Sequence, residues 1–392
     1  MEALEEEQAT INDDRSAQKA KISFPNEIVE EILSRLPVKS ILRFRSVCKS
    51  WLSLISDPSF AKLQLTRATD SYRTALFISA YDPSARKRHF LSAARDGGSV
   101  THLFTLANSP TRCDITEAEH LNGLVLFNYG NDSIYQNYAF VVNPSTHKIF
   151  KLPGLTSYAK GKVNICYFFG FDESTNEHKV LSIVSYDVQS IKPKHQIMVF
   201  SFTNYSWRKI NVDLPSDCRW YNGIKRSACV NSVIHLILQN QKEILAFDLR
   251  TEKFLIVKIP ADAQNRSRCS RPHLMKIDGL LGVVRHDGMF ETNEMHMWTL
   301  QDYENRVWVK QTVTFPKSWS VVGCPFPLDS ANMEEIIFSL NKLSRNVISA
   351  LIYNMKSGCF KSVQFNLDHP FLCSDTVQFQ QIKCYVERIK PF

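Results

Sequence analysis

The chain has 392 residues, of which 44% are hydrophobic and 22% are charged. These proportions are typical of globular proteins and exclude a fibrous or low-complexity protein. The formal net charge of +8 comes from 47 basic and 39 acidic residues, a modest excess for this length. Charge alone therefore does not indicate a nucleic-acid-binding protein, and we expect no nucleic-acid partner.

No stretch of the sequence approaches 18 consecutive apolar residues, so we expect no membrane-spanning helix and no membrane partner. The first residues are acidic where a signal peptide needs a basic start, and we expect no secretion. Ten cysteines are scattered from Cys48 to Cys384 without a C-x-x-C pair, which indicates reduced thiols. These features predict an intracellular protein, cytoplasmic or nuclear or both.

Residues 1–20 have the composition of a solvated acidic tail, and we expect them to be disordered. The pattern then changes, because large apolar residues from Phe24 to Leu36 fall on one stripe of a 3.6-residue helix. Three further short helices are predicted, around 41–44, around 47–55 and after the Asp57-Pro58 pair. Residues 21–66 therefore predict a small all-α module.

This helical module is small but rich in large apolar side chains. Domains of fewer than about 50 residues seldom hold together by their own core. Four short helices cannot turn all these side chains inward, so we infer an apolar face that is available to a partner. The alternative is that this face docks on the rest of the same chain.

After residue 66 the helical period disappears, and runs rich in Val, Ile, Phe and Tyr follow between polar turns. A unit of strand, polar turn, strand and proline recurs about every 54 residues, closing at Pro153, Pro215, Pro260 and Pro316. This spacing predicts four-stranded propeller blades, about six of them in residues 67–392. The predicted fold class is α+β by segregated domains, and a pair of β-sandwiches is the alternative to the propeller.

Residues 22–60, ISFPNEIVEEILSRLPVKSILRFRSVCKSWLSLISDPSF, resemble an F-box. Downstream, VVNPSTHKIFKLP (141–153), SWRKI (206–210) and ILAFDLRTEKF (244–254) resemble the F-box-associated domain of plant F-box families. The resemblance implies a non-catalytic substrate-recognition subunit of an SCF-type ubiquitin ligase. It also implies that the F-box binds a Skp-type adaptor, and through it a cullin, while the β domain binds a target protein.

Carried over position by position, the resemblance implies twelve adaptor-binding residues: Phe24, Pro25, Ile28, Ile32, Leu33, Leu36, Pro37, Val38, Leu42, Val47, Cys48 and Trp51. We expect Leu36 and Trp51 to be the anchors, because bulky side chains in a desolvated centre dominate interface energy. The alternative for each residue is internal packing among the four helices.

Sequence motifs for catalysis are absent: there is no phosphate-binding glycine-rich loop, no H-E-x-x-H and no G-x-S-x-G. Cys269 and His273 are close in sequence, but a zinc site needs two more ligands, so we expect no metal. We also expect no cofactor.

Four predicted inter-strand segments are basic: Arg86–His89, Lys192–His195, Arg219 with Lys225 and Arg226, and Arg266–His273. From the last two we take six candidate target-binding residues: Arg219, Lys225, Arg226, Arg266, Arg268 and Arg271. If two or three of these segments share one face, they would bind an acidic or phosphorylated target. Unrelated solvated loops are the alternative. Two other functions stay open: an adaptor-binding protein acting outside ubiquitination, and a metabolite- or sugar-binding propeller.

Overall fold

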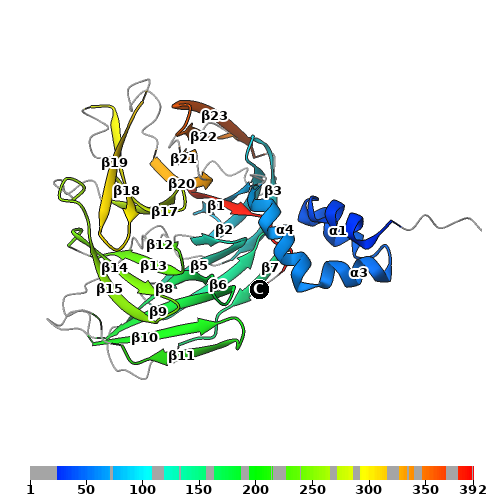
Figure 1. Cartoon of the computed structure of the whole chain (residues 1–392), viewed down its shortest axis with the longest axis horizontal. Helices are drawn as coiled ribbons and strands as arrows, with labels where there is room; N and C mark the ends of the chain where they lie inside the picture. Colours follow the sequence, from blue (N-terminus) through cyan, green and yellow to red (C-terminus); the bar gives the residue numbers. More distant parts are fainter. Residues whose placement is uncertain are drawn as a thin grey trace, which may run out of the picture.

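The computed structural model describes residues 24–70, 74–107, 119–131, 134–155, 163–186, 194–212, 214, 227–238, 240–264, 272–285, 292–315, 326–332, 335–339, 347–367, 378–390 and 392. In this part of the chain, four helices are followed by 24 strands. Figure 1 shows the helices standing to one side of the strands. The predicted order of an all-α module followed by an all-β region is confirmed.

The four helices are those that the apolar spacing predicted: α1 (Asn26–Ser34), α2 (Val38–Phe44), α3 (Lys49–Ser56) and α4 (Pro58–Asp70). Pro25 and Pro37 directly precede α1 and α2, where the missing N–H of proline does no harm. At α4, the Asp57 carboxylate accepts a hydrogen bond of 2.7 Å from the Ser59 N–H. The Asp57-Pro58 pair is therefore the helix start that the sequence predicted.

The strands form four antiparallel sheets of four strands and one sheet of eight. The eight-stranded sheet consists of two antiparallel groups of four joined by one parallel pair, so there are six groups of four. From the inner to the outer strand, the first group is β24 (Gln378–Val386), β1 (Thr74–Asp82), β2 (Lys87–Ala94) and β3 (Gly98–Leu106). The second group is β4 (Glu119–Leu121), β5 (Leu124–Asn131), β6 (Ile134–Asn143) and β7 (Lys148–Lys151). The third group is β8 (Val163–Asp172), β9 (Glu177–Tyr186), β10 (Lys194–Ser201) and β11 (Ser206–Ile210). The fourth group is β12 (Ser227–Val230), β13 (Val233–Ile237), β14 (Glu243–Asp248) and β15 (Lys253–Lys258). The fifth group is β16 (His273–Ile277), β17 (Leu280–Arg285), β18 (Glu294–Asp302) and β19 (Val307–Thr314). The sixth group is β20 (Phe326–Asn332), β21 (Glu335–Ser339), β22 (Val347–Asn354) and β23 (Cys359–Asn366).

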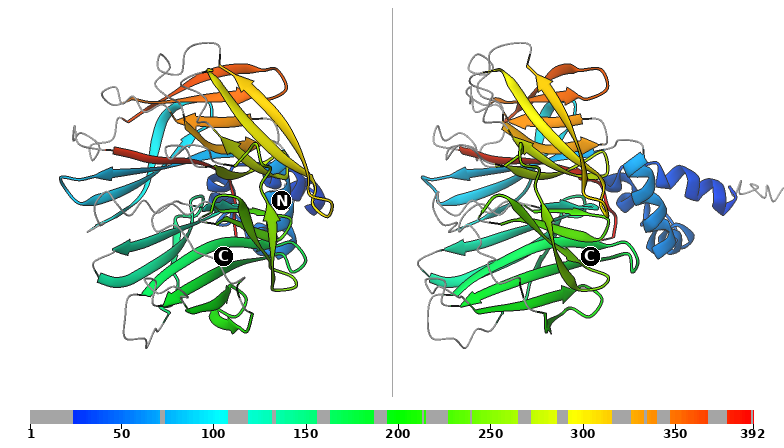
Figure 2. Two further views of the ribbon diagram at one scale, coloured as in Figure 1. Left: turned by 90° about the vertical axis from the view of Figure 1, so that its left-hand side faces the viewer. Right: turned by 60° about the vertical axis from the view of Figure 1, so that its left-hand side comes forward.

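These six groups are the blades of a propeller. The inner strands touch their neighbours in a closed ring, in the order β24, β4, β8, β12, β16, β20 and back to β24. Figure 2 shows the blades fanning out around this ring. Closing the ring removes the exposed edges that an open sheet of this many strands would have. The expectation of about six blades is confirmed, and the sandwich alternative is wrong.

The first blade is built from both ends of the strand region. Its inner strand β24 comes from the far end of the chain and pairs antiparallel with β1, from Thr74 opposite Val386 to Tyr81 opposite Gln378. At the rim, β23 and β3 also pair in parallel through Phe365 opposite Gly98, which joins the sixth blade to the first. The ring therefore closes through hydrogen bonds rather than through the covalent chain.

One turn design recurs in the hairpins. An Asp or Asn ends the first strand, and its side-chain oxygen accepts the N–H two residues on, as Asp248 does from Arg250 at 2.8 Å and Asn354 from Lys356 at 3.1 Å. The fifth residue has a positive φ, for example 56° at Glu252. Asp and Asn favour such turns because their short side chains bond the local backbone.

The core consists of apolar clusters between facing blades. The cluster between the third and fourth blades, for example, contains Leu181 and Ile183 from one sheet and Leu245 and Phe247 from the other, all fully buried. The helical module has a separate core of its own. The blades are thus held by the same sheet-on-sheet packing that their alternating apolar sequence predicts.

Candidate functional site

The helical module is organised around a small buried core. It comprises Val29, Leu33, Val38, Ile41, Ile55 and Phe60, together with Ile389 from the other end of the chain. Leu33 and Val38 are among the twelve predicted adaptor-binding residues, but they are 1% and 0% exposed. In this conformation they support the module and offer almost no surface to a partner.

Outside this core, the module exposes five large hydrophobic side chains: Phe24 at 61%, Ile28 at 47%, Ile32 at 53%, Val47 at 60% and Leu52 at 42%. We call these five residues the apolar helical surface. Ile28 and Ile32 are four positions apart on α1 and so lie on the same side of that helix. The described residues include nine exposed large hydrophobics in all, so more than half of them belong to this short module.

Four of these five residues were predicted from the sequence; Leu52 was missed. It lies on α3 one position after Trp51, and its place in the apolar spacing of that helix was the available signal. Of the remaining predicted residues, Pro25, Pro37 and Cys48 are exposed, while Leu36, Leu42 and Trp51 are half-buried. The structure therefore brings most of the predicted set to the surface of one module.

The two predicted anchors contact the module itself. Leu36 and Trp51 both pack against its buried core. The Trp51 ring also meets the Phe44 ring edge-on, with centroids 5.4 Å apart and planes at 81°. This geometry is favourable for aromatic pairs. Each anchor therefore combines internal packing with remaining exposed surface.

A cluster of charged groups joins two helices of the module. Arg67 on α4 pairs with Glu31 on α1, and its guanidinium donates a hydrogen bond of 2.7 Å to the Ser34 hydroxyl. Arg35 pairs with the same carboxylate. Hydrogen bonds from Arg67 and Arg35 hold the pKa of Glu31 below its ordinary value. α1 is thus tied to α4 by a charge cluster as well as by the core.

Cys48 lies at the start of α3, where hydrogen bonds from the Ser50 hydroxyl and the Trp51 N–H lower the pKa of its thiol. The side chain is exposed, and its sulfur lies 3.3 Å from the Ser50 oxygen. No base or acid that could serve a reaction lies beside it among the contacts of the described residues. We interpret Cys48 as part of the module surface and not as a nucleophile.

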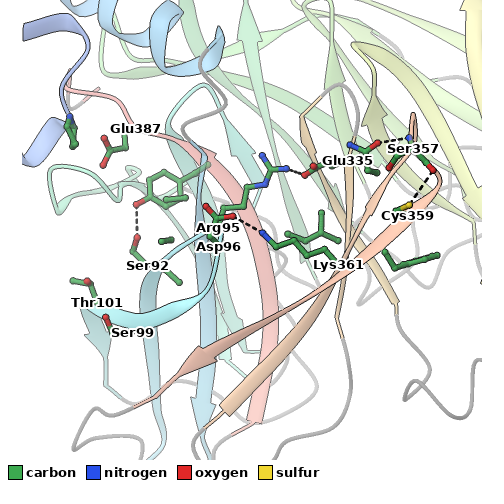
Figure 3. A pocket seen from close by; sticks show the side chains of 18 residues that line it. Ser92, Arg95, Asp96, Ser99, Thr101, Glu335, Ser357, Cys359, Lys361 and Glu387 are labelled. Atoms are coloured by element: carbon green, nitrogen blue, oxygen red, sulfur yellow. Dashed lines mark hydrogen bonds and ion pairs between the residues drawn. The ribbon is translucent and has the colours of Figure 1, made fainter. Parts of the chain in front are cut away.

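A cavity of about 970 Å³ lies beside the module, between the first and sixth blades. Figure 3 shows its charged side chains, and the carboxylates among them are all engaged. Glu335 pairs with Arg95, Asp96 lies 3.1 Å from the Lys361 ammonium, and Glu387 accepts the Val38 N–H. A glycosidase needs two carboxylates free to act on one bond. This cavity does not provide them, so it gives no support to a sugar-processing enzyme.

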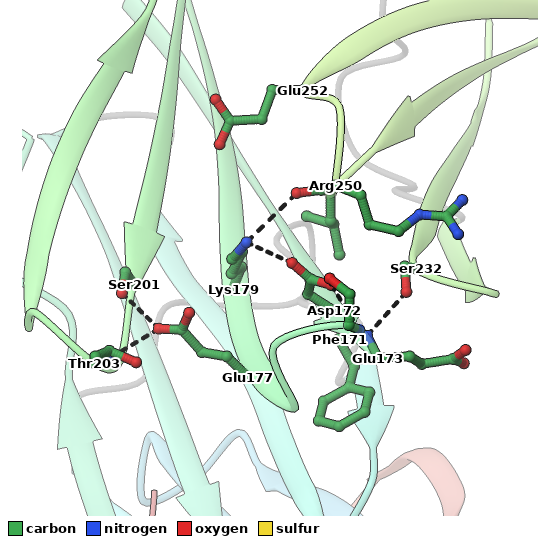
Figure 4. A network of polar contacts seen from close by, with 12 residues as sticks. Phe171, Asp172, Glu173, Glu177, Lys179, Ser201, Thr203, Ser232, Arg250 and Glu252 are labelled. Carbon is green, nitrogen blue, oxygen red and sulfur yellow. Dashed lines mark hydrogen bonds and ion pairs between the residues drawn. The ribbon is translucent and has the colours of Figure 1, made fainter.

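A polar network joins the third and fourth blades on the side of the module (Figure 4). Burial opposes ionisation of Asp172, but the Lys179 ammonium at 2.7 Å and the Ser174 hydroxyl lower its pKa to about 2. Lys179 also donates to the Leu249 carbonyl in the next blade, and the Glu173 N–H donates to the Ser232 hydroxyl at 2.9 Å. These contacts are structural, because each group already has its partner.

The described residues contain no group of three His, Cys, Asp or Glu side chains that could hold a metal ion. Of the Cys269 and His273 pair, Cys269 lies outside them and His273 is buried. No helix in the described ranges is long and apolar enough to cross a membrane.

The six candidate target-binding residues, Arg219, Lys225, Arg226, Arg266, Arg268 and Arg271, lie outside the described residues. The strand ends that flank them are described. β11 ends and β12 begins at the face opposite the turn that holds Ser232, because antiparallel strands alternate in direction. The ends of β15 and β16 at Lys258 and His273 belong to that same face.

The arrangement defines a class: a β-propeller protein that carries a small helical interaction module. Residues 22–63 match the F-box domain, and residues 63–379 match the F-box associated beta propeller domain. The second match spans most of the chain. The chain therefore belongs to the F-box associated β-propeller family.

Plant F-box proteins are similar over most of their length. F-box protein At3g57590 of Arabidopsis thaliana is 25% identical over 362 residues, which cover 87% of this chain and 84% of the relative. F-box protein At1g30790 of the same plant is 26% identical over 321 residues, covering 76% and 77%. Among solved structures, an oligogalacturonate lyase in complex with manganese is 11% identical with a TM-score of 0.38, covering 74% of this chain and 78% of that one. That likeness is too distant to support any conclusion.

Proposed function

We propose that the chain is the substrate-recognition subunit of an SCF-type ubiquitin ligase and performs no chemistry itself. The apolar helical surface carries this proposal. Full burial of one large apolar side chain stabilises by about 1.5–3 kcal/mol. Burying five such side chains, each roughly half-exposed, would therefore stabilise a complex by several kcal/mol. The entropy lost on association opposes this gain.

The partner of this surface in our proposal is a Skp-type adaptor, which joins the chain to a cullin. The described residues supply no catalytic constellation, and none is needed, because a receptor accelerates ubiquitin transfer by holding its target nearby. Such tethering raises the effective concentration of the target to about millimolar. We place the complex inside the cell, in the cytoplasm or the nucleus.

We propose the opposite face of the propeller for the target, through the six basic residues named above. This assignment is supported by the flanking strand ends at Ile210, Ser227, Lys258 and His273, which lie on the face away from the helices. An acidic or phosphorylated protein would fit such a surface. We also propose the division into residues 1–20, 21–66 and 67–392 as tail, adaptor-binding and target-binding parts, with the second boundary falling within α4.

The test is co-purification with a Skp-type adaptor. Ile32→Asp places a charge on the apolar helical surface, and burying an unpaired charge is costly. We expect it to abolish adaptor binding. Val309→Asp is the matched control, because Val309 is 49% exposed on β19, far from the helices. Equal adaptor binding by both variants would contradict the proposal.

Assembly with a cullin separates the ligase from the alternative. A ternary complex of chain, adaptor and cullin that transfers ubiquitin to a captured target supports the receptor. Adaptor binding that excludes the cullin would instead favour an adaptor-binding protein acting outside ubiquitination.

A further inference from the structure

The last residues of the chain lie between its two parts. After β24 the segment Glu387–Lys390 leaves the first blade and runs between the helices and the second blade, with Phe392 beyond it. Figure 1 marks the C-terminus beside the helical module. We call Glu387–Lys390 together with Phe392 the C-terminal segment.

On one side the C-terminal segment binds the helical module. The Glu387 carboxylate accepts a hydrogen bond of 3.0 Å from the Val38 N–H, which caps the start of α2 from 349 positions away. α2 has no side-chain cap of its own. Gln64 on α4, 1% exposed, donates to the Glu387 carbonyl at 3.2 Å and accepts from the Ile389 N–H at 3.3 Å. The Ile389 side chain completes the core of the module.

On the other side the same segment binds the second blade. Asn143, fully buried, donates through its amide nitrogen to the carbonyls of Arg388 and Lys390, each at 2.9 Å. The Arg388 N–H donates to the Ser145 hydroxyl at 3.1 Å. A side chain on Gly123 would come within 2.3 Å of the Arg388 Cβ, so the β4–β5 turn is shaped to receive this residue.

The end of the segment is held by aromatic rings. Phe392 packs against Phe150 and Phe202 of the second and third blades, with centroids 5.7 Å and 6.0 Å away. The helical module and the blades are also joined by the chain between α4 and β1, and α4 touches β24. The C-terminal segment therefore adds a second attachment that reaches α2, α4 and two blades at once.

These contacts are strong because they are buried and paired. Leaving one buried donor or acceptor without its partner costs about 1–3 kcal/mol. Small interfaces between domains normally permit relative motion, which such contacts oppose. Gln64 binds the segment from the helical side by two hydrogen bonds. Asn143 binds it from the blade side, also by two hydrogen bonds.

We infer that the C-terminal segment fixes the orientation of the helical module on the propeller, with Gln64 and Asn143 as the positioning residues. In a ligase receptor this would set the distance between adaptor and target, a consequence that rests on the proposed function. The orientation itself does not, because it belongs to the chain alone.

The test measures the distance distribution between two spin labels on the isolated full-length chain. Spin-labelled unnatural amino acids at Lys62 on α4 and Lys253 on β15, both exposed, avoid the ten cysteines. We expect one narrow distribution in the wild type. Asn143→Asp keeps the turn acceptor for the Ser145 N–H but sets a carboxylate against two carbonyls, and we expect its distribution to be about twofold broader.

Matched variants separate orientation from stability. Asn354→Asp changes the same turn position in the sixth blade, where the Asn354 oxygen likewise accepts the N–H two residues on, and should match the wild type. Glu387→Gln keeps an acceptor for the Val38 N–H and should also match, whereas Glu387→Ala and Gln64→Leu should broaden the distribution. All variants should keep the wild-type adaptor affinity.

A narrow, wild-type distribution in Asn143→Asp and Gln64→Leu would overturn the inference, as would equal broadening in Asn354→Asp. Removal of residues 387–392 gives the largest expected effect, and the point variants decide the matter if the truncated chain does not fold. Neither adaptor nor target enters the distance measurement, so its result is independent of the proposed function.

Discussion

The Nε2 atom of His235 lies 3.2 Å from the hydroxyl oxygen of Tyr303, so that an inner strand pair of the fourth blade is joined to the hairpin turn of the fifth. The other ring nitrogen, Nδ1, lies 3.2 Å from the Ala228 carbonyl oxygen, which can only accept. Nδ1 therefore carries the proton, and Nε2 accepts from the tyrosine. His235 is 1% exposed and neutral in this arrangement.

This neutral histidine makes stability depend on pH. Burial lowers the pKa of His235 from 6.5 to about 4. Below pH 6.5 the unfolded chain binds a proton that the folded chain does not, so stability falls as the pH drops from about 6.5 to about 4. Below that value both states are protonated, and the contribution of this residue levels off.

His235→Gln removes the titrating group, and we expect it to flatten the stability profile by up to about 1.4 kcal/mol per pH unit in that window. The measurement is the midpoint of urea unfolding between pH 4 and 7. His147→Gln is the control, because it makes the same substitution at an exposed histidine. Identical slopes for the wild type and His235→Gln would refute the prediction.

Phe24 and Trp51 should respond differently to truncation. Phe24 is 61% exposed, so Phe24→Ala should weaken adaptor binding about tenfold without changing the melting temperature. Trp51 also packs on Phe44, and Trp51→Ala should reduce both adaptor affinity and the stability of the module, the latter by about 2 kcal/mol. Calorimetric titration with the adaptor and a thermal melt distinguish the two. A destabilised Phe24→Ala would show that Phe24 supports the fold.

Gly170 allows the third and fourth blades to approach. A Cβ at this position would come within 2.6 Å of a Leu249 methyl and 2.8 Å of an Ile234 methyl. Gly170→Ala should therefore overpack the cluster between the blades and lower the free energy of unfolding by about 1–3 kcal/mol. Gly154→Ala is the control, since nothing lies within 4 Å of its added Cβ. Equal urea midpoints for the two variants would argue against this close approach.

The recurring turn predicts opposite effects at two equivalent positions. Gly358 has a φ of 66° with nothing within 4 Å of an added Cβ, so Gly358→Ala should cost about 1 kcal/mol from the backbone alone. His147 occupies the same turn position with a φ of 57° and is exposed, and His147→Gly should be neutral or stabilising by a similar amount. Urea unfolding measures both. Destabilisation by His147→Gly would show that its side chain makes a contact worth more than the strain.

The sequence predicted which segments form helices and strands better than it predicted which of their side chains are buried. The hairpins recognised from their prolines are the two outer strands of four blades, such as β14 and β15, because strand alternation and turn chemistry are local properties. Ile32 and Leu33, adjacent on α1, were both assigned to the adaptor, yet one is 53% and the other 1% exposed. Which of them turns inward depends on the packing of the whole module core, which includes Ile389 from the far end of the β region, and local spacing carries no information about that packing.

The pairing within the first blade also could not be predicted from local sequence patterns. The strands β1, β2 and β3 have no proline-closed hairpin, and their inner neighbour β24 begins at Gln378. Pairing between segments this distant depends on the closure of the whole ring and not on any local signal. The six basic candidates remain predictions.

Because β24 follows all the other described strands in the chain, the first blade stays without its innermost strand until residues 378–386 have been synthesised. A nascent chain that stalls or ends early would display an unpaired β1 edge and, lacking Ile389, an unfinished helical core. Such a copy would expose unpaired backbone and apolar surface of the kind that chaperones and proteases act on.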